Sequence, residues 1–382
     1  DPAAASDFAR ALRLPVVTTM SARGEFTNDN PLYLGMLGSA GHPSVHDFLR
    51  DEADLLLVAG TGMGAMSRGP LASGALDLAR TRIAAINLDP GELERGFAPY
   101  QTPASLPLQL LRADAGAAFR TLLELWGEAP FYKPLFSDYE RSYYKPCLAQ
   151  PIEGGPASGV RGSLLQSDAL AILAEHTPQA GHVLFDAGNC AAAALHYVDV
   201  EPGVSSTIAL GMGGMGYALA GAIGAQLGSL PGTRTLVFAG DGAFLMTGFE
   251  VHTAVDLKLP ILFVVFNNNM HGMCAVRQQL YFGSRYESVR YPAVDLSAVA
   301  RGFADPDALW VGAARSAKEL YQRLDEYYNG AADRPGVLEL CLAQEEMPPF
   351  APFLPADAPR TGKLRASVPP PRRALRSLRA RL

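Results

Sequence analysis

Short apolar runs alternate with amphipathic stretches along most of the chain. The runs predict strands, which lie at residues 14–18, 54–60, 83–88, 182–186, 206–210, 235–239, 261–266, 309–312 and 337–342. Helical periodicity is clear at residues 167–176, where Ser167 or Ser163 is the expected N-cap, and at residues 317–328. Apolar strands that alternate with helices are typical of parallel sheets. The pattern therefore predicts an α/β fold made of two doubly wound parallel-sheet domains, the second with a sheet of about six strands.

The composition changes between residues 126 and 161, which are rich in aromatic residues, proline and glycine. We expect this stretch to be a linker that its aromatic side chains pack over the surface. It would separate a first domain at residues 1–125 from a second at residues 162–350. A proline-rich, basic tail follows at residues 351–382, and its last nine residues fit either a short amphipathic helix or a solvated tail.

Composition and charge exclude two classes of partner. With 48% apolar residues in 382 positions the chain can bury a sizeable core, and 32 basic against 38 acidic residues do not indicate a nucleic-acid binder. Residues 205–233 carry no charge and are long enough for a membrane span, but their glycines and polar residues favour a buried strand and helix. We therefore expect neither nucleic acid nor membrane as a partner.

The cysteine pattern and the start of the sequence indicate a compartment. Cys147, Cys190, Cys274 and Cys341 are widely spaced and form no CxxC pair. The sequence opens Asp-Pro-Ala-Ala-Ala and shows no signal peptide. We expect a reduced, cytoplasmic protein.

Polar side chains follow two of the predicted strands. Asp241 lies between two glycines directly after the strand at 235–239, and Asn267 and Asn268 follow the strand at 261–266. Because parallel strands end at the same edge of a sheet, a carboxylate and an amide 27 positions apart should meet there. With a backbone carbonyl they are the hard oxygen donors that magnesium takes alongside phosphate oxygens. A plain doubly wound fold with an Asp and an Asn at loop tips is the alternative.

Two helices are also expected, one within this motif and one before it. We expect a helix after Asp241 with Leu245, Phe249 and His252 on one face. A second helix is expected to open from the glycine-rich residues 211–216. Small residues recur there every four positions from Gly216 to Gly228, so another backbone should pack closely against one helix face.

The Gly-Asp-Gly at 240–242, its distance from the Asn-Asn at 267–268 and the residues around them resemble the signature of thiamine-diphosphate enzymes, in their acetolactate-synthase-like branch. In the first domain, residues 15–19, 34–38, 53–57 and 86–90 are similar to the middle domain of acetolactate synthases. The resemblance implies a middle domain at 1–125, truncated at its N-terminus, and a diphosphate-binding domain at 162–350. Its first strand and glycine-rich loop do not appear in this sequence.

The resemblance also implies a cofactor site. Magnesium would be held by Asp241, the Asn268 side chain and the Met270 carbonyl. The implied contacts of thiamine diphosphate are Gly188, Asn189, Cys190, Gly213, Gly214, Met215, Gly240, Asp241, Gly242, Ala243, Phe244, Asn268, Met270, His271, Gly272 and Met273. Cys190 stands where the family commonly has a histidine, and a buried small residue is an equal interpretation of it.

Three residues are candidates for catalysis. Met215 matches the apolar residue that bends the family's cofactor into a V, unless it is a core methionine. His271 is a possible proton shuttle, although lone histidines are often structural. Arg277 aligns with a tryptophan that selects the second 2-oxo acid in the family. An arginine there would suit a carboxylate-bearing acceptor, and an exposed helical arginine is the alternative.

The middle domain of the family often holds FAD, gripped partly by an arginine after the strand that corresponds to 55–59. This chain has Gly62 at that place, within a Gly-x-Gly-x-Gly loop at residues 60–64. The motif alone is weak evidence for a dinucleotide site. We expect a flexible loop, and FAD absent or weakly held.

The family's pyrimidine-binding domain, whose glutamate activates the cofactor, has no match in this sequence. One hypothesis is a split enzyme: a partner chain supplies that domain, a pyruvate-like 2-oxo acid is decarboxylated, and the acyl carbanion equivalent passes to a carbonyl acceptor. A simple decarboxylase that releases an aldehyde is a variant of it. The other hypothesis is a non-catalytic cofactor-binding or scaffolding homologue.

Overall fold

The computed structural model describes residues 2–28, 30–68, 81–97, 109–127, 150–151, 163–176, 181–201, 203–343 and 345–350. The chain divides into two compact units, Asp1–Cys147 and Leu148–Leu382. This division falls within residues 126–161, where we expect the linker. Most of that stretch, and all of the tail at 351–382, lies outside the described residues.

The first unit alternates helices and short strands. Its described elements are α1 (Pro2–Leu12), β1 (Val16–Thr18), η1 (Met20–Ala22), β2 (Tyr33–Met36), α2 (Pro43–Asp51), β3 (Leu55–Ala59), α3 (Ala65–Arg68), β4 (Arg82–Asn87), α4 (Pro90–Phe97), β5 (Gln109–Arg112) and α5 (Ala115–Gly127). The strands form a two-stranded sheet β1-β2 and a three-stranded sheet β3-β4-β5, both parallel. A shared core joins Leu34 and Val45 to Val58, Ile83 and Ala85. The predicted parallel α/β architecture is confirmed here.

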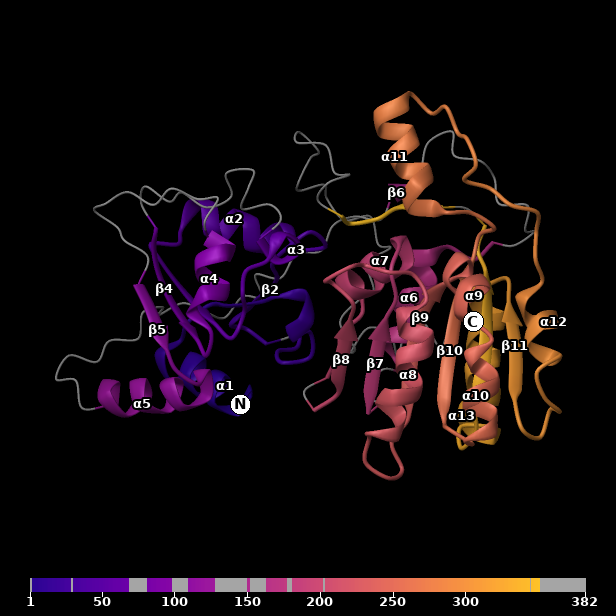
Figure 1. Ribbon diagram of the computed structural model, residues 1–382, viewed down its shortest axis with the longest axis horizontal. Helices are drawn as coiled ribbons and strands as arrows, with labels where there is room; N and C mark the ends of the chain where they lie inside the picture. Colours follow the sequence, from indigo (N-terminus) through magenta and orange to yellow (C-terminus); the bar gives the residue numbers. More distant parts are fainter. Residues whose placement is uncertain are drawn as a thin grey trace. The chain divides into compact units, whose positions relative to one another are not determined.

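The second unit is built on one parallel sheet of six strands in the order β11-β12-β10-β9-β7-β8 (Figure 1). Its strands are β7 (His182–Phe185), β8 (Ser205–Ile208), β9 (Thr235–Gly240), β10 (Ile261–Asn267), β11 (Trp310–Ala314) and β12 (Gly336–Cys341). A small antiparallel pair joins β6 (Gln150–Pro151) to β13 (Glu346–Met347). Each of the six strands lies within a residue or two of its predicted position.

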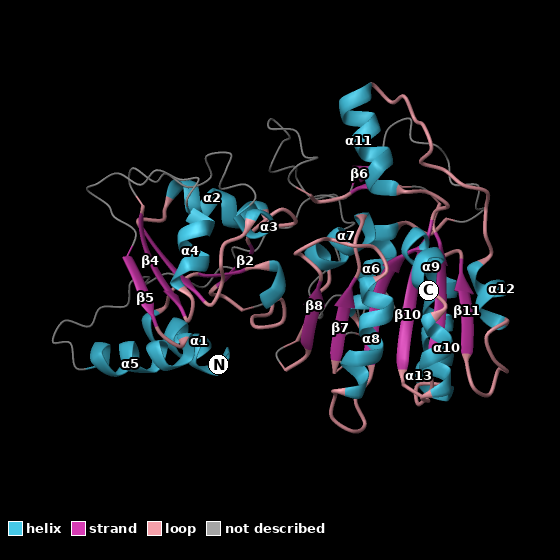
Figure 2. Ribbon diagram, viewed as in Figure 1, coloured by secondary structure: helices cyan, strands magenta, loops and turns pink. Residues whose placement is uncertain are grey.

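Helices cover both faces of the large sheet, as Figure 2 shows. The described helices of this unit are α6 (Gln166–Ala174), α7 (Asn189–Tyr197), α8 (Tyr217–Leu227), α9 (Asp241–Thr247), α10 (Glu250–Asp256), α11 (Gly272–Phe282), α12 (Leu296–Arg301) and α13 (Ala317–Gly330). Helices α8, α9, α10 and α12 share one apolar core with the strands, represented by Leu219, Phe244, Val251, Phe263 and Leu296. Helix α11 stands beyond the ends of the strands (Figure 1). This arrangement is the predicted doubly wound α/β fold.

The strand order has a switch point between β7 and β9. From β7 the chain moves outward to β8, and then continues on the other side with β9 and β10. In open parallel sheets, ligands bind outside the carboxyl ends of the strands at such a point. Asp186 follows β7 directly, and Asp241, the first residue of α9, follows β9 directly.

Two predictions about the helices are wrong. Neither Ser163 nor Ser167 is the N-cap of α6, which is Leu165. Instead the Glu346 carboxylate accepts hydrogen bonds from the Ser167 backbone N–H at 2.8 Å and from its hydroxyl at 2.9 Å. The Glu346 carboxylate, far away in the sequence, therefore accepts the hydrogen bond at the start of α6 that a local serine hydroxyl was expected to accept.

The helix expected after Asp241 is two helices, α9 and α10, with Gly248 between them. A Cβ on Gly248 would lie 2.8 Å from Cδ1 of Phe244, so the turn needs glycine. The three residues expected to share one face all lie at the surface: Leu245 is 47% and Phe249 76% exposed, and His252 is exposed too.

The face of α8 that carries the small residues is exposed to solvent within the described part of the chain. Ala220, Gly224 and Gly228 are exposed, and a Cβ on Gly224 would meet nothing within 4 Å. The opposite face, with Ala218, Leu219 and Ala222, packs into the core instead. Among the described residues, none of the helices is both long and apolar enough to cross a membrane.

Candidate functional site

Asp241 is the centre of the site. It is 4% exposed and follows the last residue of β9. One carboxylate oxygen accepts from the Gly242 N–H at 2.7 Å, and the other accepts from the Asn268 and Met270 N–H groups at 3.0 and 3.4 Å. The turn after β10 is therefore wrapped around the Asp241 carboxylate. Burial raises the pKa of Asp241, while the Tyr291 hydroxyl and the surrounding backbone N–H groups hold it down.

The two asparagines that end β10 point to different partners. Asn267 donates to Glu339 Oε1 at 2.6 Å and to the Val294 carbonyl at 2.9 Å, so it ties β10 to its neighbours. The Asn268 amide nitrogen instead donates to Glu345 Oε2. Only Asn268 lies at the edge with Asp241, as the sequence predicts.

Glu345 is a site residue that sequence reasoning missed. It follows β12, is 5% exposed, and its Oε1 accepts from the Asn189 side-chain nitrogen at 3.0 Å. Burial, together with the Asp241 and Glu346 charges, raises the pKa of Glu345 to about 7, although the Asn189 and Asn268 donors act against the rise. In the sequence, Glu345 could be recognised only as an acidic residue that comes after a buried strand. The signal is weak because Glu345 does not directly follow Cys341, the last residue of β12.

The loop after β7 reaches the same place. Gly188 has φ +113°, and Asn189 is the first residue of α7. The Asn189 side-chain oxygen is buried and has no hydrogen-bond partner among the described residues. Cys190 is buried so near that a Cβ on Gly240 would lie 3.5 Å from its sulfur. Burial and the Asp186, Glu345 and Asp241 charges raise the pKa of the Cys190 thiol well above its usual value.

A second missed residue, Asp186, fixes the glycine-rich loop. Its two carboxylate oxygens accept from the Gly216 and Ala218 N–H groups, each at 2.8 Å, and so cap α8 from the neighbouring strand. Burial raises the pKa of Asp186, and these N–H groups oppose the rise. Within the loop Met215 is 38% and Met212 94% exposed. An acidic residue directly after a buried strand, as at Asp241, was the signal that could have revealed it.

The remaining predicted contacts surround Asp241. His271 precedes α11, and its ring lies 5.3 Å from that of Tyr291. A Cβ on Gly242 would lie 3.0 Å from His271 Nδ1, so this glycine allows the ring to approach. Burial and the Asp241 charge raise the pKa of Tyr291.

Other predicted residues contribute differently. Ala243 and Phe244 are 2% and 3% exposed and belong to the core cluster beneath the site, so their side chains pack there. Met273 is half-buried and packs with Val276. Arg277 is exposed on α11.

The residues present fit a magnesium diphosphate. Asp241 and Asn268 offer hard oxygens, and the buried Asn189 oxygen is an acceptor that lacks a donor or a cation. Gly188 and Gly213 have positive φ, and a Cβ at either would meet nothing within 4 Å. The open space over these glycines suits a bulky anionic group.

Fold and site together define an α/β protein that binds a phosphate-bearing cofactor at the carboxyl edge of a parallel sheet. Comparison with protein-family models agrees: residues 2–109 match "Thiamine pyrophosphate enzyme, central domain" and residues 186–340 match "Thiamine pyrophosphate enzyme, C-terminal TPP binding domain". The chain belongs to the thiamine pyrophosphate enzymes. Its resemblance to the family is thereby confirmed in both units.

Curated relatives are named acetolactate synthase large subunits. The chain is 27% identical over 285 residues to the "Acetolactate synthase large subunit" of Porphyra purpurea, covering 73% of this chain and 44% of that protein. It is 26% identical over 283 residues to the "Probable acetolactate synthase large subunit" of Methanocaldococcus jannaschii, covering 74% and 46%. With "Acetolactate synthase isozyme 1 large subunit" of Escherichia coli the identity is 25% over 303 residues, covering 79% and 50%. The chain spans about half the length of these relatives.

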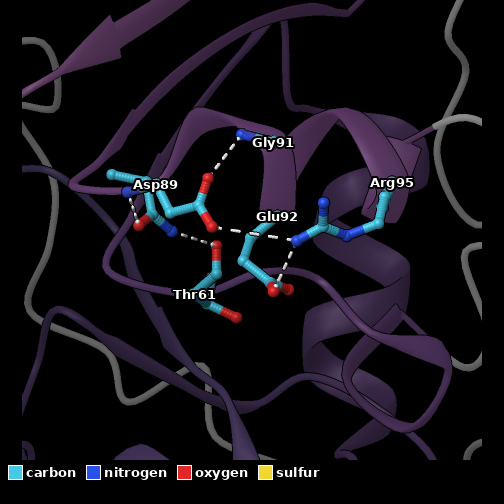
Figure 3. Close-up of polar contacts among 6 residues, drawn as sticks. Thr61, Asp89, Gly91, Glu92 and Arg95 are labelled. Carbon is cyan, nitrogen blue, oxygen red and sulfur yellow. Dashed lines mark hydrogen bonds and ion pairs between the residues drawn. The ribbon is translucent and has the colours of Figure 1, made fainter.

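The first unit contains the position at which the family resemblance implies an FAD-binding arginine. Gly62 occupies it, and a Cβ there would lie 2.9 Å from Oε2 of Glu92. Figure 3 shows Glu92 and Asp89 at this edge, with Arg95 donating to Glu92 at 2.6 Å and lying 3.8 Å from Asp89. The expected loop spans residues 60–64, since α3 begins at Ala65.

Proposed function

We propose that this chain carries the diphosphate-binding half of a thiamine-diphosphate-dependent lyase or synthase. It would act on a pyruvate-like 2-oxo acid and pass the acyl carbanion equivalent to a carbonyl acceptor. The observation that carries the proposal is the turn of Asn268 and Met270 wrapped around the buried Asp241 carboxylate. The names of the relatives support the acetolactate-synthase-like chemistry.

Each site residue has a part in this proposal. Asp241, the Asn268 side-chain oxygen and the Met270 carbonyl would hold Mg²⁺ against the diphosphate. Thiamine diphosphate, when bound, supplies the electron sink for decarboxylation. Met215, partly exposed on the glycine-rich loop, would support the bent cofactor, and His271 would move a proton near the substrate.

Arg277 is proposed to bind the acceptor. It is exposed on α11, which begins directly after the metal-binding turn. A guanidinium can bind a carboxylate in a bidentate manner. An acceptor that carries a carboxylate is therefore expected, and an aldehyde-releasing decarboxylase would need no such group.

A partner chain is proposed to supply the pyrimidine-binding domain and its activating glutamate. Exposed apolar side chains gather on the neighbouring helices α8 and α9, on the loop before α8 and at the N-cap of α10; they are Met212, Met215, Tyr217, Leu245, Met246 and Phe249. Large exposed apolar surfaces mark interaction sites. This set includes Met215 of the candidate site, so a protein bound there would adjoin the cofactor.

Two further assignments complete the proposal. FAD is not expected, because Gly62 lacks a cationic side chain and the Asp89 and Glu92 carboxylates at that edge would repel a dinucleotide diphosphate. A reduced, cytoplasmic location is supported by the free thiols of Cys190, Cys274 and Cys341.

Calorimetric titration of the protein with thiamine diphosphate and Mg²⁺ tests the site. The wild type should bind, and Asp241→Ala should weaken Mg²⁺-dependent binding by at least about 100-fold, because it removes a metal ligand and the anchor of the Asn268 turn. Asp295→Ala, at the exposed cap of α12, is the matched control and should bind as the wild type does. Unchanged affinity in Asp241→Ala would remove the site assignment.

Turnover tests the chemistry. Consumption of pyruvate and related 2-oxo acids should require this chain, a chain bearing the pyrimidine-binding domain, thiamine diphosphate and Mg²⁺ together. Tight cofactor binding without turnover in any pairing would instead indicate a non-catalytic homologue. Release of an aldehyde as sole product would indicate the simple decarboxylase.

A further inference from the structure

Glu345 lies between the two asparagines of the site and contacts both. Its Oε1 accepts from the Asn189 amide nitrogen at 3.0 Å, and its Oε2 accepts from the Asn268 amide nitrogen. The carboxylate is 5% exposed. Gly272 closes the space above it, because a Cβ there would lie 2.7 Å from the Glu345 Cδ. The contact therefore leaves little room for rearrangement.

This contact determines which way each amide faces. An ionised carboxylate has only acceptors, so each asparagine must turn an N–H toward it and its oxygen elsewhere. The structure shows the result at Asn189, whose side-chain oxygen is buried with no hydrogen-bond partner among the described residues. At Asn268, the same contact leaves the side-chain oxygen available on the side away from Glu345.

We propose that Glu345 is a positioning residue that fixes the Asn268 amide so that its oxygen, and not its nitrogen, is presented to a divalent cation at Asp241. The inference rests on the proposed function, because it concerns the same metal site. Glu345 need not touch the cation. It acts through Asn268, as carboxylates that orient metal ligands commonly do.

The proposal predicts an unusual effect of Glu345→Gln. The glutamine keeps the size of the side chain, but its amide nitrogen would face the Asn268 nitrogen, donor against donor. With the glutamine oxygen kept on Asn189, the Asn268 amide restores a hydrogen bond by turning over, which gives its oxygen to Gln and its nitrogen to the cation. Cation affinity should then fall although the protein remains folded.

The double variant Asn268→Asp with Glu345→Gln should restore cation binding. In Asn268→Asp alone two buried carboxylates face each other, which is unfavourable. With glutamine at 345, the new amide nitrogen can donate to one oxygen of the aspartate and leave the other for the cation. The glutamine oxygen still accepts from Asn189, so residue 345 keeps a hydrogen bond to each of its two neighbours.

The experiment measures Mn²⁺ binding by electron paramagnetic resonance in the presence of thiamine diphosphate, together with the melting temperature of each variant. Glu345→Gln should raise the Mn²⁺ dissociation constant by about 10- to 100-fold, and the double variant should recover most of the loss. Glu346→Gln is the matched control. It is a buried neighbour that caps α6 through Ser167, so it should change stability and leave Mn²⁺ affinity as in the wild type.

The outcomes separate the inference from the proposed function. If the wild type binds no thiamine diphosphate with Mn²⁺, the proposed function fails and the inference with it. If the wild type binds and both Glu345→Gln and Glu345→Ala, which leaves Asn268 without this acceptor, bind Mn²⁺ equally well, the positioning role alone is wrong. Loss in Glu345→Gln without recovery in the folded double variant would also overturn it, because a general structural role predicts no such rescue.

Discussion

At the scale of single residues, three buried carboxylates organise the site, and none of them needs to contact substrate. Asp186 holds the glycine-rich loop through backbone N–H groups, and Asp241 holds the turn after β10 in the same manner. Glu345 holds side-chain amides instead. A buried carboxylate is costly unless it is hydrogen-bonded. Here the bonds that satisfy each one also fix a segment of the proposed cofactor site.

Gly272→Ala should weaken cation binding, although Gly272 supplies no ligand to the proposed cation. The new Cβ would lie 2.7 Å from Cδ of Glu345 and 3.1 Å from the Asn189 side-chain nitrogen, so the carboxylate between the asparagines would have to shift. We expect Mg²⁺ affinity to fall by about 10-fold or more. Titration of the variant measures this. Gly283→Ala, where a Cβ meets nothing within 4 Å but φ is +60°, is the control for backbone strain alone. Equal Mg²⁺ affinity in Gly272→Ala and the wild type would show that Asn189, Glu345 and Asn268 tolerate the displacement of the carboxylate.

The pKa of Glu345 predicts a pH dependence of the cation-free protein. Its folded pKa of about 7 lies above the ordinary 4.5, so at low pH both states are protonated and the group contributes nothing. Between these values the unfolded chain has lost the proton that the folded chain keeps. The free energy of unfolding should therefore fall as pH rises through this window, by on the order of 3 kcal/mol, and level off above it.

Chemical unfolding of the cation-free protein from pH 5 to 8 measures this effect. Glu345→Gln should flatten the decline, although Asp241, Asp186 and Glu346 also have raised pKa values and leave part of it. Parallel curves for the wild type and the variant would contradict the assigned pKa.

At the scale of elements, helices α8 and α9 each bury one face in the core and leave an apolar face outward. Gly248 divides α9 from α10, and this break turns Phe249 outward, where it is 76% exposed. The small residues of α8 lie exposed nearby in the same layer. A surface of this kind is expected to be covered by another protein.

Substitution of this face should weaken partner binding without loss of stability. Met246→Glu with Phe249→Glu places two charges at exposed positions, so the free energy of unfolding should change by less than about 1 kcal/mol. Association with the chain that carries the pyrimidine-binding domain should weaken by about 10-fold or more. Analytical ultracentrifugation measures it. Val299→Glu, an exposed apolar position on α12 outside this face, is the control and should associate normally.

At the scale of the whole molecule, each unit has its own hydrophobic core, and every described residue of the proposed cofactor site belongs to the second. Cofactor binding should therefore stabilise one unit directly. Scanning calorimetry with Mg²⁺ and thiamine diphosphate at 100 times the dissociation constant should add about 2.7 kcal/mol to the second unit. For a unit of this size that corresponds to an upward shift of about 5–10 °C in its transition.

The transition of the first unit should not move in that experiment, and Asp241→Ala should abolish the shift. A single transition that moves as a whole would contradict independent units. Retention of the shift in Asp241→Ala would contradict the site.

The sequence determined the fold and the centre of the site because both follow from local patterns. Apolar runs with the period of buried strands predict the six-stranded sheet to within a residue or two, and parallel strands must bring Asp241 and Asn268 to one edge. The same rule applied to Asp186 would have found it.

Only the tertiary structure decided which polar groups meet across long stretches of chain. Glu346 caps α6 from 179 positions away, and Glu345 reaches Asn189 and Asn268 across 156 and 77 positions. Such pairings leave no periodic trace in the sequence, because they depend on where separate loops end in space. The outward face of α8 to α10 was missed for a related reason: an apolar stripe shows that a face will be covered, and only the fold shows whether this chain covers it.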